Sequence, residues 1–224
     1  MKETLKDLTK NMWTVPNLLS FIRILLVPLF AVLFMKEQYV WSIIVLALSG
    51  LSDFFDGKIA RKFNQVSALG KILDPVADKL TQITIAIVFY ITFAGSSDKT
   101  VKAFSWIFLI FLIKEAVMVV GGAIMIATGL KPGAAELPGK IGTFAFYLIM
   151  ISIMAFGPDI GICRNVFTYP APVMIVLVCI SAILTLVAFS SYVPGVWRQI
   201  QDKKKAKAEA AASGSSGGDS SEEK

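Results

Sequence analysis

Residues 52–79 read SDFFDGKIARKFNQVSALGKILDPVADK, and they separate two segments that are apolar enough to cross a lipid bilayer. This short stretch holds four aspartates and five lysine or arginine residues. Carboxylates at or near a bilayer are costly unless partners, water or metal ions compensate their charge. The stretch therefore predicts a polar site where membrane helices end.

The composition of the whole chain predicts an integral membrane protein. Of its 224 residues, 55% are hydrophobic and the mean hydropathy is +0.69, whereas soluble domains contain roughly 45–50% apolar residues. A membrane span needs about 20 predominantly apolar residues. The chain offers six such segments, at about residues 18–35, 40–57, 76–95, 104–129, 140–157 and 170–195. We therefore expect an all-α protein, a six-transmembrane-helix bundle.

The loops between these segments are short, so the chain is expected to form one membrane domain, residues 14–200, with two tails. Residues 1–13 lack the apolar core of a signal peptide and are expected to form an amphipathic segment on the membrane surface. Residues 201–224 are polar and low in complexity, which predicts a disordered tail. Its basic cluster either binds anionic lipid or acts only as a topology signal.

The distribution of lysine and arginine predicts the orientation. With six spans, the N-terminus, the 2–3 connection, the 4–5 connection and the C-terminal tail share the basic side of the membrane. The opposite side holds only Lys36, Lys99, Lys102 and Arg164. Basic loops face the cytoplasm, so the aspartates are expected at the cytoplasmic face of a bacterial-type cell membrane.

Two residue types limit the chemistry. The chain contains no histidine, which excludes a histidine base, a histidine zinc ligand and a Ser-His-Asp triad. Cys163 and Cys179 are isolated, so we expect them to act as small apolar residues and not as metal ligands. Acid–base chemistry therefore falls to carboxylates.

Two helices are expected to carry the aspartates. On the first, Asp53 and Asp56 share one face with two small residues, Gly57 and Ala60, so that a ligand can approach the backbone closely. This face predicts a binding surface for a polar ligand.

The second helix carries Asp74 and Asp78, which lie one turn apart. Pro75 suits a first helical turn, which makes Asp74 the expected N-cap of the third span. Four converging carboxylates would repel one another without cations between them, and Mg²⁺ is held by carboxylates together with substrate phosphates. The alternative is a set of ordinary ion pairs at a helix end.

The whole segment resembles the signature of the CDP-alcohol phosphotransferase family of membrane enzymes, D-x2-D-G-x2-A-R-x8-G-x3-D-x3-D. Its eight fixed positions are Asp53, Asp56, Gly57, Ala60, Arg61, Gly70, Asp74 and Asp78. The opening of the first span, PNLLSFIRILLVP, is similar to the start of phosphatidylglycerophosphate synthases, and the six-span pattern extends the resemblance over about residues 14–195.

The resemblance implies transfer of a phosphatidyl group from CDP-diacylglycerol to an alcohol, with release of CMP. It implies one or two Mg²⁺ or Mn²⁺ ions held by the four aspartates, and a further role for Asp78 as the base that takes the alcohol proton. The positions that would contact CDP-diacylglycerol are Gly57, Ala60, Arg61 and Gly70. Membrane lipids are the expected surroundings, no nucleic acid is expected, and a homodimer is an open alternative.

The acceptor pocket departs from the pattern of phosphatidylglycerophosphate synthases. Those enzymes usually carry an arginine seven residues after a glutamate in the fourth span, and a second lysine in a G-K-x-K-T segment that opens the fifth. Gly122 and Gly142 stand at these two positions. The remaining candidates for binding an acceptor phosphate are Arg23, Lys114, Lys131 and Lys140.

Three of the charges inside spans have alternative explanations. Lys114 and Glu115 are adjacent and point about 100° apart, so a mutual salt bridge is a weak explanation for them. Pairing with charges on other helices is the open alternative to the functional role that intramembrane charges favour. Arg23 could instead extend to the membrane interface.

Three functions are therefore compared. The first expectation is a phosphatidylglycerophosphate synthase with glycerol 3-phosphate as acceptor. The second is a CMP-forming cardiolipin synthase with phosphatidylglycerol as acceptor, which the two missing cations favour. The third is a divalent-cation carrier, although carriers hold their ions near the bilayer midplane and these aspartates lie at a helix end.

Overall fold

The computed structural model describes residues 14–62, 67, 69–128, 130, 137–158, 160–163 and 165–215. Within these residues the side chains of 53–58, 60–61, 71–72, 137–138, 140 and 206–215 are outside the description. The interfacial segment predicted for residues 1–13 lies outside the described residues.

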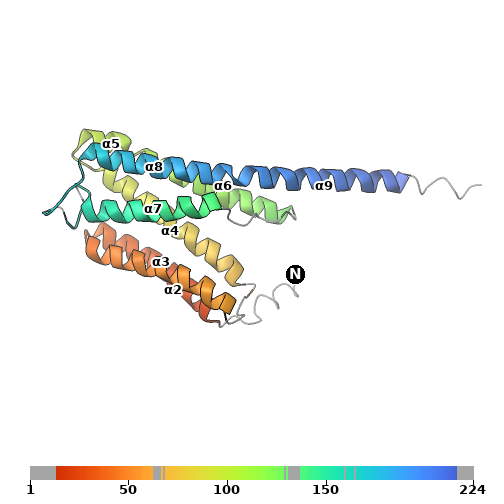
Figure 1. The fold of residues 1–224 in the computed structure, drawn as a ribbon, viewed down its shortest axis with the longest axis horizontal. Coiled ribbons are helices and arrows are strands. Elements are labelled where there is room, and N and C mark those ends of the chain that lie inside the picture. Colours follow the sequence, from red (N-terminus) through yellow and green to blue (C-terminus); the bar gives the residue numbers. More distant parts are fainter. Residues whose placement is uncertain are drawn as a thin grey trace, which may run out of the picture.

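The described chain is built of helices joined by short connections (Figure 1). The helices are α2 (Val15–Met35), α3 (Tyr39–Lys62), α4 (Gly70–Ala94), α5 (Lys99–Phe104), α6 (Ile107–Ala127), α7 (Leu137–Phe156), α8 (Ala171–Ser190) and α9 (Tyr192–Ser215). Four stretches are long and apolar enough to cross a membrane: Val15–Met35, Leu73–Ala94, Lys99–Ala127 and Ala171–Lys205. Two shorter apolar helices accompany them, Tyr39–Ser52 and Ile141–Phe156. The chain is a multi-pass membrane protein, and a total of six crossings stays a prediction.

The helix surfaces explain why the bundle needs lipid around it. Large apolar side chains point outward along the spans, with Leu25 and Phe144 each 70% exposed. Helices that are apolar on their outer faces as well as their inner ones are typical of a membrane environment.

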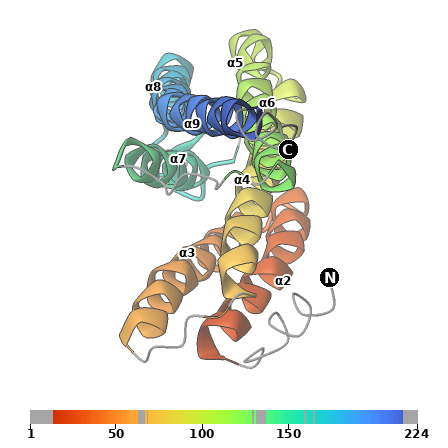
Figure 2. The ribbon, with the colours of Figure 1, turned by 90° about the vertical axis from the view of Figure 1, so that its right-hand side faces the viewer.

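Helix α4 connects two parts of the bundle. Helix α2 packs against α3 and α4, while α4 also contacts α6, and α8 contacts α6 and α7 (Figure 2). A row of aromatic rings runs through these contacts: Phe34, Phe89, Phe108, Phe111 and Phe146 have successive ring centroids 5.3, 5.6, 6.1 and 5.0 Å apart. Such pairs add stability beyond the area they bury, so this row fixes α4 between α2 and α6.

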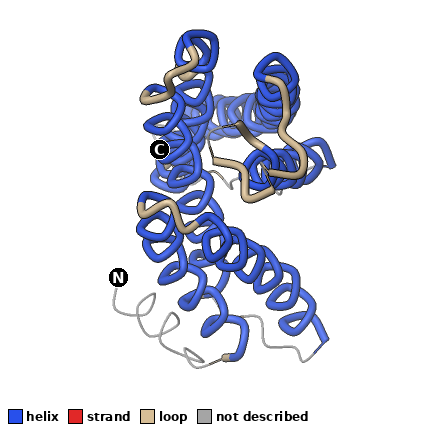
Figure 3. The backbone as a smooth tube through the Cα atoms, turned by 90° about the vertical axis from the view of Figure 1, so that its left-hand side faces the viewer, coloured by secondary structure: helices blue, strands red, loops and turns tan. Residues whose placement is uncertain are grey.

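The connections divide between the two ends of the bundle. Residues 36–38, 95–98, 157–158, 160–163 and 165–170 belong to the end that faces the viewer in Figure 3. The start of α4 and the end of α6 therefore lie at the opposite end. Asp74 and Asp78 are in the first turns of α4, which places them near that opposite end of the bundle.

The C-terminal region is more ordered than its composition predicts. Helix α9 follows α8 after Ser191 and continues to Ser215, beyond the rest of the bundle (Figure 1). It replaces the disorder predicted for residues 201–215. Alanine, lysine and glutamate, which dominate this stretch, are strong helix formers, and α8 supplies the helical turns from which they continue.

Candidate active site

Helix α3 carries the first two aspartates near its C-terminal end. Its helical backbone runs from Tyr39 to Lys62, which puts Asp53 and Asp56 on one face. The side chains of this helix end lie outside the described part of the chain. The roles expected of Asp53, Asp56, Gly57, Ala60 and Arg61 therefore stay predictions.

Helix α4 carries the second pair of aspartates, and it begins earlier than the sequence indicates. The helix starts at Gly70, with Leu69 in the N-cap position. The predicted N-cap role of Asp74 is therefore wrong. The Ser67 hydroxyl accepts the Gly70 N–H at 2.9 Å and satisfies one of the donors that a helix start leaves unpaired, so the helix can begin one turn before Asp74.

Ser20 of α2 holds Asp74 in place. The Ser20 side chain is fully buried, and its hydroxyl donates a hydrogen bond to Oδ1 of Asp74. The same hydroxyl oxygen lies 3.0 Å from the Pro16 carbonyl oxygen. This contact ties the carboxylate to a neighbouring helix and restricts the directions in which it can point.

Ser20 belongs to a buried polar stripe along α2. Asn17, Ser20 and Arg23 are spaced three residues apart and are 1%, 0% and 2% exposed. Arg23 is therefore enclosed by protein, and its extension to the membrane interface stays a prediction. Asn17 and Ser20 were not among the predicted site residues, although the three-residue spacing of polar side chains in PNLLSFIR was a signal that could have identified them.

Asn17 gives Gly70 a packing role. Ser67 Oγ donates to Asn17 Oδ1 at 2.7 Å, and a Cβ atom at Gly70 would lie 2.7 Å from that same Oδ1. Real Cβ atoms do not approach this closely, so a larger residue at position 70 would displace the Asn17 side chain and its hydrogen bond with Ser67. The contact of Gly70 with CDP-diacylglycerol stays a prediction.

Both oxygens of Asp78 have hydrogen-bond donors. Gln82 Nε2 donates to Oδ2 at 2.8 Å, and the Tyr147 hydroxyl of α7 lies 3.4 Å from Oδ1. Neither donor was among the predicted site residues. Gln82 follows Asp78 by one helical turn and was therefore detectable from its spacing, whereas Tyr147 becomes a neighbour only when α7 packs into the bundle.

A buried carboxylate lies beside this pair. Glu115 of α6 is 1% exposed, and its Oε2 is 2.8 Å from Lys79 Nζ. Lys114 Nζ forms an ion pair with Oε1, a pairing that the adjacent positions disfavoured, and Lys79 supplies the pairing with another helix that the sequence left open. The flexible four-carbon stem of lysine lets the ammonium group turn back across the helix surface.

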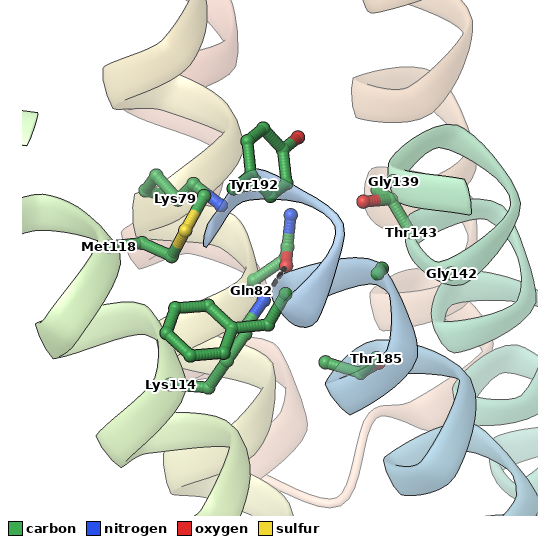
Figure 4. A pocket seen from close by; sticks show the side chains of 11 residues that line it. Lys79, Gln82, Lys114, Met118, Gly139, Gly142, Thr143, Thr185 and Tyr192 are labelled. Atoms are coloured by element: carbon green, nitrogen blue, oxygen red, sulfur yellow. Dashed lines mark hydrogen bonds between the residues drawn. The ribbon is translucent and has the colours of Figure 1, made fainter. Parts of the chain in front are cut away.

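The two lysines and Gln82 line a small pocket between α4, α6, α7 and α8 (Figure 4). Its volume is about 30 Å³, and Thr143, Thr185 and Tyr192 complete its polar lining. Lys114 Nζ lies 3.5 Å from Gln82 Oε1. Hydrogen bonds and ion pairs therefore connect Asp78 through Gln82 and Lys114 to Glu115.

The two glycines at the acceptor positions have different surroundings. A Cβ atom at Gly142 would lie 3.0 Å from Ala188 Cβ and 3.2 Å from the Leu184 carbonyl oxygen. A Cβ atom at Gly122 would meet no atom within 4 Å. Among the other acceptor candidates, Lys131 lies outside the described residues, as does the side chain of Lys140.

The described residues fit part of the predicted metal site. Asp74 and Asp78 present carboxylate oxygens one turn apart, which are the donors that Mg²⁺ and Mn²⁺ prefer. Ser20, Gln82 and Tyr147 orient them, as hydrogen-bond partners commonly orient metal ligands. No group of three or more acidic, cysteine or histidine side chains occurs among the described ones, so a full set of ligands needs side chains from the end of α3.

The chain belongs to the CDP-alcohol phosphatidyltransferase family, whose model matches residues 13–190. It is therefore a membrane transferase of phospholipid biosynthesis, which confirms the family indicated by the aspartate signature. The family uses CDP-diacylglycerol and an alcohol as substrates.

The relatives of the chain are named as two different kinds of enzyme. The chain is 36% identical over 154 residues to a cardiolipin synthase (CMP-forming) of Streptomyces coelicolor, a match that covers 64% of this chain and 68% of the relative. It is 38% identical over 141 residues to a putative cardiolipin synthase of Mycobacterium bovis, covering 62% of this chain and 64% of the relative. It is 31% identical over 182 residues to the CDP-diacylglycerol--glycerol-3-phosphate 3-phosphatidyltransferase of Aquifex aeolicus, covering 80% and 93%.

Proposed function

We propose that the chain is a CMP-forming cardiolipin synthase, which transfers the phosphatidyl group of CDP-diacylglycerol to phosphatidylglycerol. The observation that carries this proposal is the pair of glycines at the acceptor positions. Gly142 is packed against α8 and leaves no room for a long cation, while Gly122 opens onto an apolar groove. Neither position supplies a cation to hold an acceptor phosphate, and the apolar walls of the groove beside Gly122 suit an acceptor that brings its own acyl chains.

The relatives support the same choice. Those named cardiolipin synthase have identities of 36% and 38%, against 31% for the glycerol-3-phosphate enzyme. The longer alignment of the Aquifex aeolicus protein argues in the other direction. Phosphatidylglycerophosphate synthase, which the sequence alone favoured, becomes the second candidate because its named relative has the lower identity.

The transfer replaces a phosphoanhydride bond of CDP-diacylglycerol by a phosphoester bond to the acceptor. The acceptor hydroxyl oxygen bonds to the phosphorus that carries diacylglycerol, and the bond from that phosphorus to the CMP oxygen breaks. The hydroxyl proton passes to the Asp78 carboxylate, and CMP leaves with the negative charge. A carboxylate is the remaining base in a chain without histidine, and general-base assistance contributes typically about 10²–10⁴-fold.

The neighbouring side chains orient the reacting groups. Gln82 and Tyr147 hold the two oxygens of Asp78, while Ser20 holds Asp74. Asp53, Asp56, Asp74 and Asp78 would bind one or two Mg²⁺ or Mn²⁺ ions. When bound, such ions neutralise charge on the departing CMP. Gly57, Ala60, Arg61 and Gly70 would contact CDP-diacylglycerol.

Glycerol 3-phosphate has one structural observation in its favour. Lys79 and Lys114 line the small pocket beside Asp78, and either ammonium group could contact an acceptor phosphate. Both lysines are already paired with Glu115, which reduces the positive charge available. Arg23, Lys131 and Lys140 stay candidates for the same contact. Membership in a transferase family argues against the cation carrier.

The orientation is part of the proposal. Lys203 of α9 contacts Thr128 at the end of α6, the end of the bundle that carries Asp74 and Asp78. Lysine-rich segments face the cytoplasm, so we place the active site on the cytoplasmic side. Six crossings agree with this arrangement, because both termini then lie on the same side.

A product assay tests the proposal. Purified protein is incubated with CDP-diacylglycerol and Mg²⁺ or Mn²⁺, together with either phosphatidylglycerol or glycerol 3-phosphate, and CMP and the lipid product are measured. We expect cardiolipin from phosphatidylglycerol. Turnover with glycerol 3-phosphate and none with phosphatidylglycerol would establish the second candidate instead.

A further inference from the structure

Helices α6 and α9 leave an apolar groove between them, near the end of the bundle that carries the aspartates. The two helices lie side by side in both ribbon views (Figures 1 and 2). The groove has a volume of about 670 Å³, within the range of roughly 300–1,000 Å³ found for sites that bind small molecules. Its apolar walls include Val117, Ile124 and Met125 from α6 and Val196, Trp197 and Ile200 from α9.

Two glycines keep the groove open on the α6 side. Gly121 and Gly122 both line it, and a Cβ atom added at either would meet nothing within 4 Å. Larger side chains at these positions would occupy the space between the helices. The groove is therefore accessible to an apolar chain along its length.

The length of the groove matches one leaflet of a bilayer. Its lining extends from Val117 to Thr128 on α6 and from Val193 to Lys204 on α9, which corresponds to about 17 Å along each helix axis. The hydrocarbon core of a bilayer is about 30 Å thick, so half of it has nearly the same length. An acyl chain from a single leaflet would fit this dimension.

Positive charge is concentrated at one end of the groove. Lys203 and Lys204 both line it there. Lys203 Nζ donates to the Thr128 carbonyl oxygen and so connects α9 to the end of α6, while Lys204 is exposed. Apolar walls with lysines at one end match the charge pattern of an anionic phospholipid.

We propose that this groove binds one anionic phospholipid, with an acyl chain between α6 and α9 and the phosphate at Lys203 and Lys204. Three residues, Met118, Phe189 and Tyr192, line both the groove and the polar pocket beside Asp78. The bound lipid therefore lies next to the active site. This proposal concerns binding and holds whichever acceptor the enzyme uses.

Fluorescence quenching of Trp197 tests the site directly. Replacing Trp13, Trp41 and Trp106 by phenylalanine in the full chain leaves Trp197 as the single tryptophan. The protein is placed in phosphatidylcholine bilayers that contain increasing fractions of phosphatidylglycerol with brominated acyl chains, and brominated phosphatidylcholine is the reference lipid. We expect half-maximal quenching at a mole fraction at least about fivefold lower for the anionic lipid, because a lysine near the headgroups favours anionic lipid by about that factor.

Matched variants separate the groove from general lipid contact. Lys204→Ala should reduce the preference for the anionic lipid, whereas Lys205→Ala, an exposed neighbour outside the lining, should retain it. Gly122→Leu fills the groove and should weaken quenching by both lipids, whereas Gly195→Leu, which also has open space around it, should not. Equal quenching by the two lipids in the native background would overturn the proposal, as would an unchanged preference in Lys204→Ala.

Discussion

Lys79 on α4 and Glu115 on α6 form an ion pair with 2.8 Å between Nζ and Oε2. The next residue after Asp78 in the chain is thus fixed to a buried carboxylate of another helix. Lys114 holds the second oxygen of Glu115 and contacts Gln82, which in turn donates to Asp78. The position of the proposed base therefore depends on charged side chains of α4 and α6.

Removing the shared carboxylate should destabilise the bundle. Glu115→Gln keeps the shape of the side chain but leaves two largely buried lysines without their counter-charge. Breaking a buried ion pair in this way typically costs about 3–5 kcal/mol. We expect a clear fall in the melting temperature in detergent, measured beside Glu37→Gln, an exposed connection residue that should be nearly neutral. Equal melting temperatures for the two variants would contradict this account of Glu115.

The Ser20 hydroxyl should matter for metal binding more than for stability. Ser20→Ala removes the donor to Asp74, and loss of a partner that orients a metal ligand typically reduces affinity or activity by about 10–100-fold. Titration of activity with Mg²⁺ or Mn²⁺ should show a higher half-saturating concentration. Ser42→Ala is the control, because Ser42 is equally buried but donates to the Gln38 carbonyl at the other end of α3. The same titration curve for both variants would exclude a positioning role for Ser20.

The sequence predicted the features that depend on local spacing. The aspartate signature identified the family and the two helices that carry it, and the apolar segments predicted an all-helical membrane protein. Contacts that depend on helix packing were not predictable in this way. Tyr147 reaches Asp78 from 69 positions further along the chain, and Lys79 meets Glu115 only because α4 packs against α6.

Local rules also failed where packing competed with them. Pro75 suggested a helix start at Asp74, but Ser67 and the close approach of Gly70 to Asn17 place that start one turn earlier. Polar composition suggested disorder after residue 200, yet strong helix formers continue α9 to Ser215.

The acceptor glycines should respond to the same substitution with opposite signs. Gly142→Ala forces a Cβ atom to 3.0 Å from Ala188 Cβ, and overpacking of this kind costs about 1–3 kcal/mol. Gly122→Ala meets open space and should gain up to about 1 kcal/mol from higher helix propensity. Thermal unfolding in detergent of the two variants and the native protein checks both signs. A stabilising Gly142→Ala would mean that α7 does not pack against α8 as closely as described.

Activity should depend on a divalent cation. Exhaustive chelation should stop CMP release, and added Mg²⁺ or Mn²⁺ should restore it. Asp53→Asn and Asp74→Asn should each abolish turnover while leaving the melting temperature of the metal-free protein nearly unchanged, because both residues serve a polar site and not the apolar core. Full activity after chelation would exclude the two-helix metal site.

Asp78→Asn separates the base from the metal ligands. Asparagine keeps the size of the side chain and can still bond to Gln82 and Tyr147, but it cannot accept the hydroxyl proton. We expect this variant to bind CDP-diacylglycerol in the presence of metal, measured by direct titration, and to release CMP at least about a hundredfold more slowly at saturating acceptor. Asp202→Asn, an exposed change on α9, should have native activity. Parallel loss of metal binding, nucleotide binding and turnover would show that Asp78 acts chiefly as a ligand. Near-native turnover would exclude Asp78 as the base. Its contact with Tyr147 would then serve only to orient α4 against α7.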